Sequence, residues 1–386
     1  MSFFKRLIGN NSYTPLITVR ISRANVLHNL GVFAEAVAPA KIAPVLKANA
    51  YGHGLVEVAQ IIDEAARLPA GRQVAFLVVD SLFEARVLRD AGVMSSLLVA
   101  GYTRPADIIT ASAQMNDVAF TVATTEQVRV LAQLAQKPVR IHLKVNTGMN
   151  RQGLVMGEIK KALADLSNNP HIIIDGFFTH LASADDPKDD DFTLKQIGQF
   201  KEARAMLDKL PHKPRFMHAS NTAGARFAKL LDTNVFRLGL GLYGISPMGE
   251  SDVLKPALSM HTIATNIRRL ERPETVGYNR THTVYKPMIM AVIPAGYYEG
   301  LDRRLSNKGS VRVKGVVCSI IGRVSMNMAA IDVSAVPTIR EGDEVEVISA
   351  DAAAPNSASA MADLCETIPY DILVGINGDL RREVVE

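Results

Sequence analysis

The stretch PVLKANAYGHG, residues 44–54, contains the feature that decides the fold. It continues the apolar run KIAPVLK (residues 41–47), which stops abruptly at Lys47. Seven more apolar runs follow at fairly even intervals, at residues 74–80, 96–101, 118–123, 139–146, 172–180, 215–221 and 235–244. Most are too continuous for strands with one exposed face, so they indicate strands that are buried on both sides of a parallel sheet.

Helical patterns separate these runs. Residues 55–68 place apolar side chains at spacings of three and four. Residues 81–92 begin with a serine and end at a glycine, residues 124–136 begin with a threonine, and residues 192–210 form a longer helical pattern. Eight strand-like runs that alternate with helices predict an α/β fold, a (β/α)8 TIM barrel.

The pattern of apolar residues in the sequence changes after about residue 250. Short runs rich in Val and Ile, separated by Gly, Asn and Asp, predict a smaller, mainly β domain. We expect the barrel over residues 21–250 and the β domain over residues 251–386. The run PLITVRIS (residues 15–22) could pair with either part, and we assign residues 1–20 to the β domain. The polar segment 349–363 is expected to lead to one helix.

Composition excludes several classes of protein. The net charge of +4 over 386 residues is slight, and the basic residues are spread along the chain, so we expect no nucleic-acid partner. No stretch approaches the ~20 apolar residues of a membrane helix, so we expect no membrane partner. The start MSFFKRLIGNNS lacks the apolar run of a secretory signal, and Cys318 and Cys365 are the only cysteines, so we predict a cytoplasmic protein. No metal site is predicted.

Lys47 is the first candidate functional residue. Active sites of such barrels lie at the carboxyl ends of the strands, and Lys47 ends the first run. A lysine in a partly apolar mouth can lose its proton well below its usual pKa of ~10.4 and act as an amine nucleophile toward an aldehyde cofactor. From its position alone, however, an ordinary surface lysine is the simpler interpretation.

The segment KANAYGHG resembles the pyridoxal-phosphate lysine motif of alanine racemases, and the resemblance continues through nearly the whole chain. It implies that Lys47 carries pyridoxal 5'-phosphate and is one of two catalytic bases. It also implies a phosphate site, which the motifs HASNTAG and RLGLGLYG continue, formed by Tyr51, Asn221, Thr222, Gly239 and Leu240.

Three further residues correspond to the surroundings of the cofactor ring in that family. Arg237 corresponds to the arginine that faces the pyridine nitrogen, His218 to the histidine that orients this arginine, and His180 to the histidine beside the ring. Because a guanidinium does not give up a proton, the ring would be a weaker electron sink than usual.

The second base and the substrate contacts also follow from the resemblance. Tyr278 corresponds to the second catalytic residue, which comes from the partner subunit, so a homodimer with shared active sites is implied. Arg151 corresponds to the arginine that contacts the substrate carboxylate, and Lys144 to a lysine that is often carbamylated. Met326 corresponds to the residue whose backbone N–H meets the substrate, and Tyr297 to a tyrosine at the entrance.

Two departures from the family pattern concern the substrate pocket. The family usually reads S-M-D-M, whereas this chain has Asn327 after Met326, and we count Asn327 among the substrate-binding residues. The tail has Asn377 and Gly378 where bulkier residues are expected. Both changes are expected to widen or re-polarise the pocket.

The resemblance therefore implies a racemase that interconverts L- and D-alanine through an external aldimine by a two-base mechanism, and so supplies D-alanine for cell-wall synthesis. A serine-accepting or broad-spectrum racemase of the same family remains an alternative. A related barrel decarboxylase is disfavoured by Arg237, since such enzymes place a glutamate at the pyridine nitrogen. A non-catalytic cofactor-binding barrel is disfavoured by residues 251–386, which such proteins lack.

Overall fold

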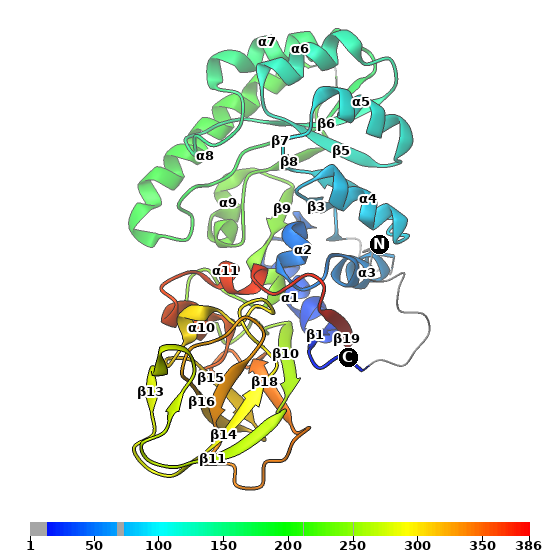
Figure 1. Ribbon diagram of the computed structural model, residues 1–386. Coiled ribbons are helices and arrows are strands. Elements are labelled where there is room, and N and C mark those ends of the chain that lie inside the picture. The colour runs from blue at the N-terminus through cyan, green and yellow to red at the C-terminus, as the bar shows by residue number, and fades with distance from the viewer. Residues whose placement is uncertain (1–13, 68–72, 211, 250) are drawn as a thin grey trace. The chain divides into compact units, whose positions relative to one another are not determined.

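The computed structural model describes residues 14–67, 73–210, 212–249 and 251–386. The motif MSFFKRLIGNNS lies outside the described residues. The chain divides into two compact units. The described residues of Ser22–Ala257, with 384–386, form the first unit, which we call the barrel unit. The described residues up to Ile21, with Leu258–Glu383, form the second, which we call the β unit (Figure 1).

Eight parallel strands form the barrel unit, as predicted. They are β2 (Lys41–Pro44), β3 (Leu77–Val79), β4 (Leu97–Val99), β5 (Val118–Val122), β6 (Val139–Lys144), β7 (Ile172–Phe178), β8 (Phe216–His218) and β9 (Val235–Leu238). Strands β3 to β8 form one sheet in sequence order, and β2 pairs with β9. Bridges from Ile42 to Val74 and from Val45 to Val78 join β2 to β3. The Asn234 N–H donates to the Met217 carbonyl at 3.1 Å and joins β8 to the start of β9.

The barrel strands are apolar because both of their faces are covered. Every residue of β3, β4, β5 and β9 is buried. One interior cluster consists of Ala43, Phe76, Val78, Leu98, Ala119, Phe216 and Val235. Burying such side chains stabilises the unit by about 1.5–3 kcal/mol for each large residue. The interior is therefore a packed core, which leaves the carboxyl ends of the strands to form a site.

Helices alternate with these strands: α1 (Arg23–Ala36), α2 (Lys47–Tyr51), α3 (Leu55–Ala66), α4 (Leu82–Asp90), α5 (Pro105–Gln114), α6 (Thr125–Leu134), α7 (Met156–Ser167), α8 (Asp190–Ala205) and α9 (Ala228–Leu231). Figure 1 shows α5 to α8 outside the strands. The predicted serine and threonine caps are confirmed, because Ser81 accepts from the Glu84 N–H and Thr124 from the Gln127 N–H. None of the described helices has the length and apolarity to cross a membrane.

A nine-stranded sheet forms most of the β unit, as the Val- and Ile-rich runs predict. Its order is β11-β14-β17-β16-β15-β18-β10-β1-β19. The strands are β1 (Thr18–Ser22), β10 (Leu258–Ile263), β11 (Asn266–Leu270), β14 (Met288–Ile293), β15 (Ser310–Val313), β16 (Val316–Ile321), β17 (Ala329–Asp332), β18 (Glu344–Ile348) and β19 (Arg381–Val385). The early run pairs with this sheet, because β1 is antiparallel to β10.

Shorter elements complete the β unit. A two-stranded hairpin consists of β12 (Thr275–Val276) and β13 (His282–Thr283). The polar segment leads to two helices, α10 (Ala358–Leu364) and α11 (Pro369–Val374), where one was expected. The second helix begins with Pro369 in its first turn, a position where the missing N–H of proline costs nothing.

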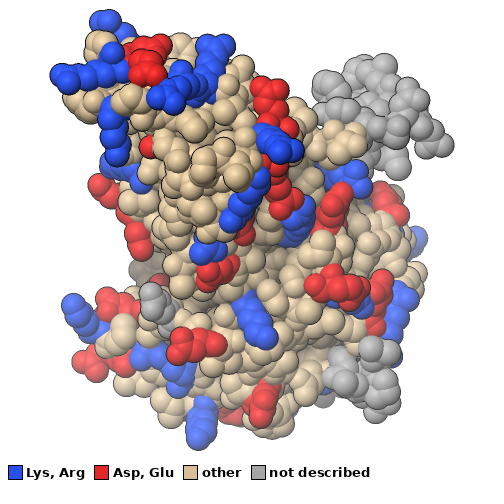
Figure 2. Space-filling view, turned by 90° about the horizontal axis from the view of Figure 1, so that it is seen from below, with Lys and Arg blue, Asp and Glu red and all other residues tan. Residues whose placement is uncertain are grey.

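On the face shown in Figure 2, Lys and Arg side chains are interspersed with Asp and Glu.

Candidate active site

Lys47 begins a turn of unusual handedness at the carboxyl end of β2. The next four residues, Ala48 to Tyr51, all have φ between 52° and 55°, so α2 is a left-handed helical turn. For L-amino acids this conformation costs roughly 1–2 kcal/mol per residue. Strain of this kind persists only where the surrounding structure holds it, and it is concentrated at functional sites.

Two side chains hold this turn. The Ala48 N–H donates to Glu84 Oε1 at 2.9 Å, and the Leu55 N–H donates to Asn49 Oδ1 at 2.8 Å. The other oxygen of Glu84 accepts from the N–H groups of Asp80 and Ser81, at 2.7 and 3.1 Å. The capping carboxylate of α4 therefore also fixes the backbone next to Lys47. This role of Glu84 was not predicted from the sequence, although a glutamate three residues after a helix-capping serine is a recognisable signal.

Tyr51, Thr222 and Gly239 form a small polar cradle at the same end of the barrel. A Cβ at position 239 would lie 2.8 Å from the Tyr51 hydroxyl and 3.9 Å from Thr222 Oγ1. The Thr222 hydroxyl accepts from the Gly241 N–H at 3.2 Å, which leaves its own proton for another acceptor. Asn221 Oδ1 accepts from the Gly224 N–H at 2.9 Å, and Leu240 follows the cradle glycine and is buried. Two hydroxyl groups beside open backbone are suited to a phosphate.

The position of Tyr51 depends on a buried aromatic residue. Its ring centroid lies 4.9 Å from that of Tyr243, and the His53 ring centroid lies 4.3 Å from that of Tyr243. The Tyr243 hydroxyl donates to the Val45 carbonyl at 2.8 Å, and burial raises the pKa of this phenol well above its usual value. Tyr243 is therefore a neutral anchor for Tyr51, and this role of Tyr243 was not predicted from the sequence.

Arg237 lies at the centre of a buried hydrogen-bond chain. Its guanidinium donates to His218 Nδ1 at 2.6 Å, to His180 Nδ1 at 2.9 Å, and to the carbonyls of Thr179 and Ala219. Burial lowers the pKa of Arg237 to about 9, so the group is still charged at neutral pH. Desolvation and the nearby Arg237 hold the pKa values of His180 and His218 well below their usual range, so both histidines are neutral.

His142 extends this chain into the barrel core. Because His218 Nδ1 accepts from the arginine, its Nε2 carries the proton and donates to His142 Nδ1 at 2.9 Å. Burial, with Arg215 and Arg237 nearby, lowers the pKa of His142 to about 3. The ring needs a glycine opposite, since a Cβ on Gly176 would lie 2.4 Å from it. The sequence signal for His142 was its position two residues before Lys144 on one strand, because residues i and i+2 face the same side.

The mouth of the barrel is strongly cationic. Lys144 has its pKa lowered to about 8 by burial and by Arg237, Arg151 and Lys47, while Asp80 acts in the opposite direction. The Lys144 amine donates to Gln152 Oε1 at 3.1 Å, and Arg151 is exposed on the loop after β6. These four cationic side chains repel one another, so anionic groups bound among them would be favourable. The site is therefore suited to a ligand with a phosphate and a carboxylate.

The remaining predicted residues, Tyr278, Tyr297, Met326 and Asn327, lie in the β unit. Tyr278 is 69% exposed and follows Gly277, whose φ is +76°. The two residues after it, Asn279 and Arg280, have φ of 58° and 52°, so this turn is strained like the one at Lys47. A Cβ on Gly277 would lie 3.2 Å from the Arg323 nitrogen, which brings the turn next to the loop that carries Met326.

Hydrogen bonds connect the loops of the β unit. The Tyr297 N–H donates to the Ser325 carbonyl at 3.0 Å, and the Asn307 amide donates to the Thr281 hydroxyl at 3.1 Å. The Ser306 hydroxyl accepts from the Val324 N–H at 3.0 Å. The structure thus brings the loops of Tyr278, Tyr297 and Met326 together within this unit.

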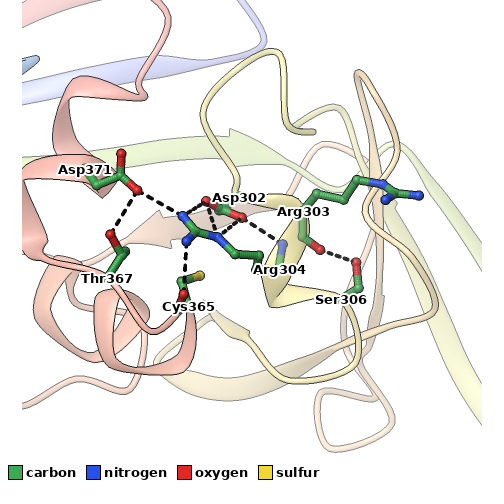
Figure 3. A network of polar contacts seen from close by, with 7 residues as sticks. All are labelled: Asp302, Arg303, Arg304, Ser306, Cys365, Thr367 and Asp371. Carbon is green, nitrogen blue, oxygen red and sulfur yellow. Dashed lines mark hydrogen bonds and ion pairs between the residues drawn. The ribbon is translucent and has the colours of Figure 1, made fainter.

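Arg304 fastens this loop cluster to the two helices. Its guanidinium binds the carboxylates of Asp302 and Asp371 and the carbonyl of Cys365 (Figure 3). Asp371 also accepts from the Thr367 hydroxyl at 3.1 Å. The loop that ends at Ser306 is therefore anchored on both sides.

Family models match both units. Residues 21–247 match the model described as "Alanine racemase, N-terminal domain", and residues 257–384 match "Alanine racemase, C-terminal domain". The chain belongs to the alanine racemase family. As a member of that family it is an amino-acid racemase, an isomerase.

Individual alanine racemases resemble the chain over most of its length. It is 35% identical over 356 residues to "Alanine racemase 2" of Oceanobacillus iheyensis, which covers 91% of this chain and 88% of that relative. It is 34% identical over 377 residues to the alanine racemase of Sorangium cellulosum, covering 94% and 97%. The solved structure of the Bacillus anthracis alanine racemase with bound L-Ala-P is 30% identical, with a TM-score of 0.86 over 97% of this chain and 96% of that chain.

Proposed function

We propose that the protein interconverts L- and D-alanine with pyridoxal 5'-phosphate as its cofactor. The observation that carries this proposal is the cationic barrel mouth, in which Lys47 opens a strained turn and Arg237 is buried, in a chain of the alanine racemase family. The names of the relatives and the L-Ala-P bound in the Bacillus anthracis structure support alanine as the substrate.

The residues at the mouth fit this cofactor. The cradle of Tyr51, Thr222 and Gly239, with Asn221 and the backbone of Leu240, would hold the phosphate. His180 would lie beside the ring, and Arg237 would face its nitrogen. Bound there, pyridoxal phosphate would supply an aldehyde that condenses with an amine and a ring that draws electrons from the substrate Cα. Arg237 donates hydrogen bonds without releasing a proton, so it would orient the ring and would leave the ring nitrogen unprotonated.

Two bases divide the proton transfers. Inversion at Cα needs a base on one face and an acid on the other. We assign removal of the α-proton of D-alanine to the Lys47 amine, and removal of the α-proton of L-alanine to the Tyr278 phenol. Arg151 would hold the substrate carboxylate with its two parallel donors, with Lys144 as a support. The Met326 N–H and Tyr297 would contact the substrate at the entrance.

We propose further that the active sites are shared in a homodimer, with Tyr278 and Met326 contributed by the partner subunit. The loops of the β unit support this. They expose large apolar side chains that a monomer leaves in water: Tyr278 (69%), Tyr285 (79%), Tyr298 (58%), Met326 (56%) and Met328 (51%). Aromatic residues and methionine are enriched in protein interfaces.

We place the enzyme in the cytoplasm, where it would supply D-alanine for the cell wall. The two free, buried cysteines, Cys318 and Cys365, support a reducing compartment.

A chiral assay on alanine, serine, lysine and arginine tests the activity and its range. We expect both alanine enantiomers to be converted into a racemic mixture. The Tyr278→Phe variant in deuterated water tests the two-base assignment. Exchange from L-alanine should fall much more than exchange from D-alanine, while cofactor binding stays intact. Equal loss from both enantiomers would contradict the assignment of Tyr278 to one face.

A further inference from the structure

Glu299 binds two loops of the β unit to each other. Its side chain is buried, with 8% of the residue exposed. Its Oε1 accepts from Asn327 Nδ2 at 2.7 Å, and its Oε2 accepts from the Gly296 N–H at 2.9 Å. Both oxygens of the Glu299 carboxylate therefore accept hydrogen bonds, one from Asn327, 28 residues later in the chain, and one from Gly296, three residues earlier.

This arrangement fixes the orientation of the Asn327 amide. A carboxylate only accepts hydrogen bonds, so Asn327 must turn Nδ2 toward Glu299 and Oδ1 away from it. Asn327 is exposed, and within the described part of the chain its Oδ1 has no hydrogen-bond donor. An aspartate at this position would place two carboxylates at hydrogen-bonding distance, which is unfavourable when both are ionised. Asn327 instead supplies a donor that the buried Glu299 carboxylate accepts.

The second departure from the family pattern belongs to the same cluster. The Asn377 N–H donates to the Glu299 carbonyl at 3.3 Å, and its side-chain amide donates to the Tyr298 carbonyl at 3.2 Å. The Tyr298 N–H donates to the Met326 carbonyl at 2.9 Å. A Cβ on Gly296 would lie 2.4 Å from that same carbonyl, so the two loops are in direct backbone contact. The segment of Glu299, which orients the Asn327 amide, is therefore also in direct contact with the backbone of Met326.

We propose that Glu299 is a positioning residue that presents the side-chain oxygen of Asn327 as a neutral hydrogen-bond acceptor beside the substrate, and that this acceptor admits small amino acids with a hydroxyl side chain in addition to alanine. The placement of the substrate rests on the proposed function, whereas the Glu299–Asn327 pair does not. A neutral acceptor pairs with a hydroxyl donor without burying a charge.

Exchanging the partners tests the pair without any substrate. Asn327→Asp should lower the melting temperature by several degrees at neutral pH, because two carboxylates then face each other. Adding Glu299→Gln should restore most of the loss, since the glutamine Oε1 accepts from Gly296 and its Nε2 donates to Asp at 327. Glu341→Gln, at an exposed position of the same unit, is the control and should change nothing. A double variant as unstable as Asn327→Asp would overturn the pairing.

Glu299→Gln alone tests the specificity. Its Nε2 would donate to Asn327 Oδ1, which turns the Asn327 amide over and presents a donor in place of the acceptor. The ratio of kcat/KM for L-serine to that for L-alanine should fall about tenfold, mainly through KM for serine, because one hydrogen bond to the substrate is lost. If the serine-to-alanine ratio of kcat/KM is unchanged in Glu299→Gln, while Glu299→Gln still restores the stability of Asn327→Asp, the proposed role of Asn327 in specificity is wrong. A wild-type protein that racemises neither amino acid would instead refute the proposed function and leave the exchange result standing.

Discussion

At the scale of single residues, the phosphate cradle depends on the missing side chain at position 239. Gly239→Ala would place a methyl group 2.8 Å from the Tyr51 hydroxyl, in the space assigned to the phosphate. We expect the dissociation constant of pyridoxal phosphate to rise at least tenfold, about 1.4 kcal/mol, because the cradle loses both room and a hydroxyl position.

An absorbance titration of the apoprotein with the cofactor measures this effect. Gly157→Ala is the matched control, since a Cβ there has no atom within 4 Å and alanine favours the first turn of α7. Equal affinities for the two variants would place the phosphate elsewhere.

Lys144 gives a prediction about pH. Its pKa of about 8 in the folded protein is below its usual 10.5, so the unfolded chain binds more protons between these values. The free energy of unfolding should therefore rise as the pH increases from 8 to 10.5, and the penalty for the buried charge is fully present below pH 8. Lys144→Met removes that penalty, so the variant should be the more stable protein at pH 7, by at most about 3 kcal/mol, and lose this advantage by pH 10.5.

Urea denaturation at several pH values measures the difference. Gln152, which accepts a hydrogen bond from the Lys144 amine, is exposed and can bind water instead, so the loss of this hydrogen bond should change the free energy of unfolding little. A Lys144→Met variant that is less stable than the wild type at pH 7 would refute the prediction.

At the scale of elements, α4 and the turn at Lys47 depend on one carboxylate. Glu84→Ala removes three hydrogen bonds, to the N–H groups of Ala48, Asp80 and Ser81. We expect a loss of about 2–3 kcal/mol in the free energy of unfolding, since capping bonds contribute about 1 kcal/mol each. Cofactor affinity should fall as well, because the left-handed turn loses its support.

Glu126→Ala provides the comparison on α6. Glu126 lies in the first turn of that helix and pairs with exposed Arg129, so its removal should lower the free energy of unfolding much less than the removal of Glu84. Equal losses for the two variants would show that Glu84 acts only as a surface charge.

The elements also show what the sequence could predict. The barrel strands were recognisable because burial on both faces requires continuous apolar runs, and Ser81 and Thr124 were recognisable because capping needs a short hydroxyl side chain. The left-handed turn was not, because Ala48 and Ala50 favour a right-handed helix and tertiary contacts override that preference. The role of Tyr243 was not predicted for a similar reason, since it depends on the contact with Tyr51, which follows the neighbouring strand β2.

At the scale of the whole molecule, the shared active site predicts complementation. Lys47→Ala and Tyr278→Phe chains should each be nearly inactive as homodimers. When the two are co-expressed, half of the dimers are mixed, and each mixed dimer has one site with both native residues. We therefore expect about a quarter of the wild-type activity.

The control is a chain that carries both Lys47→Ala and Tyr278→Phe, co-expressed with the Tyr278→Phe chain. In that combination no site has both native residues. Recovery only in the first mixture supports the shared site. If the first mixture recovers no activity, Tyr278 acts on its own barrel.

The proposed function depends above all on Lys47 as the residue that carries the cofactor. Borohydride treatment of the holoprotein, followed by proteolysis and mass mapping, measures this directly. We expect a reduced pyridoxyl group on the peptide that contains Lys47, and no such group in the Lys47→Ala protein. A pyridoxyl group found on another lysine, or on none, would contradict it.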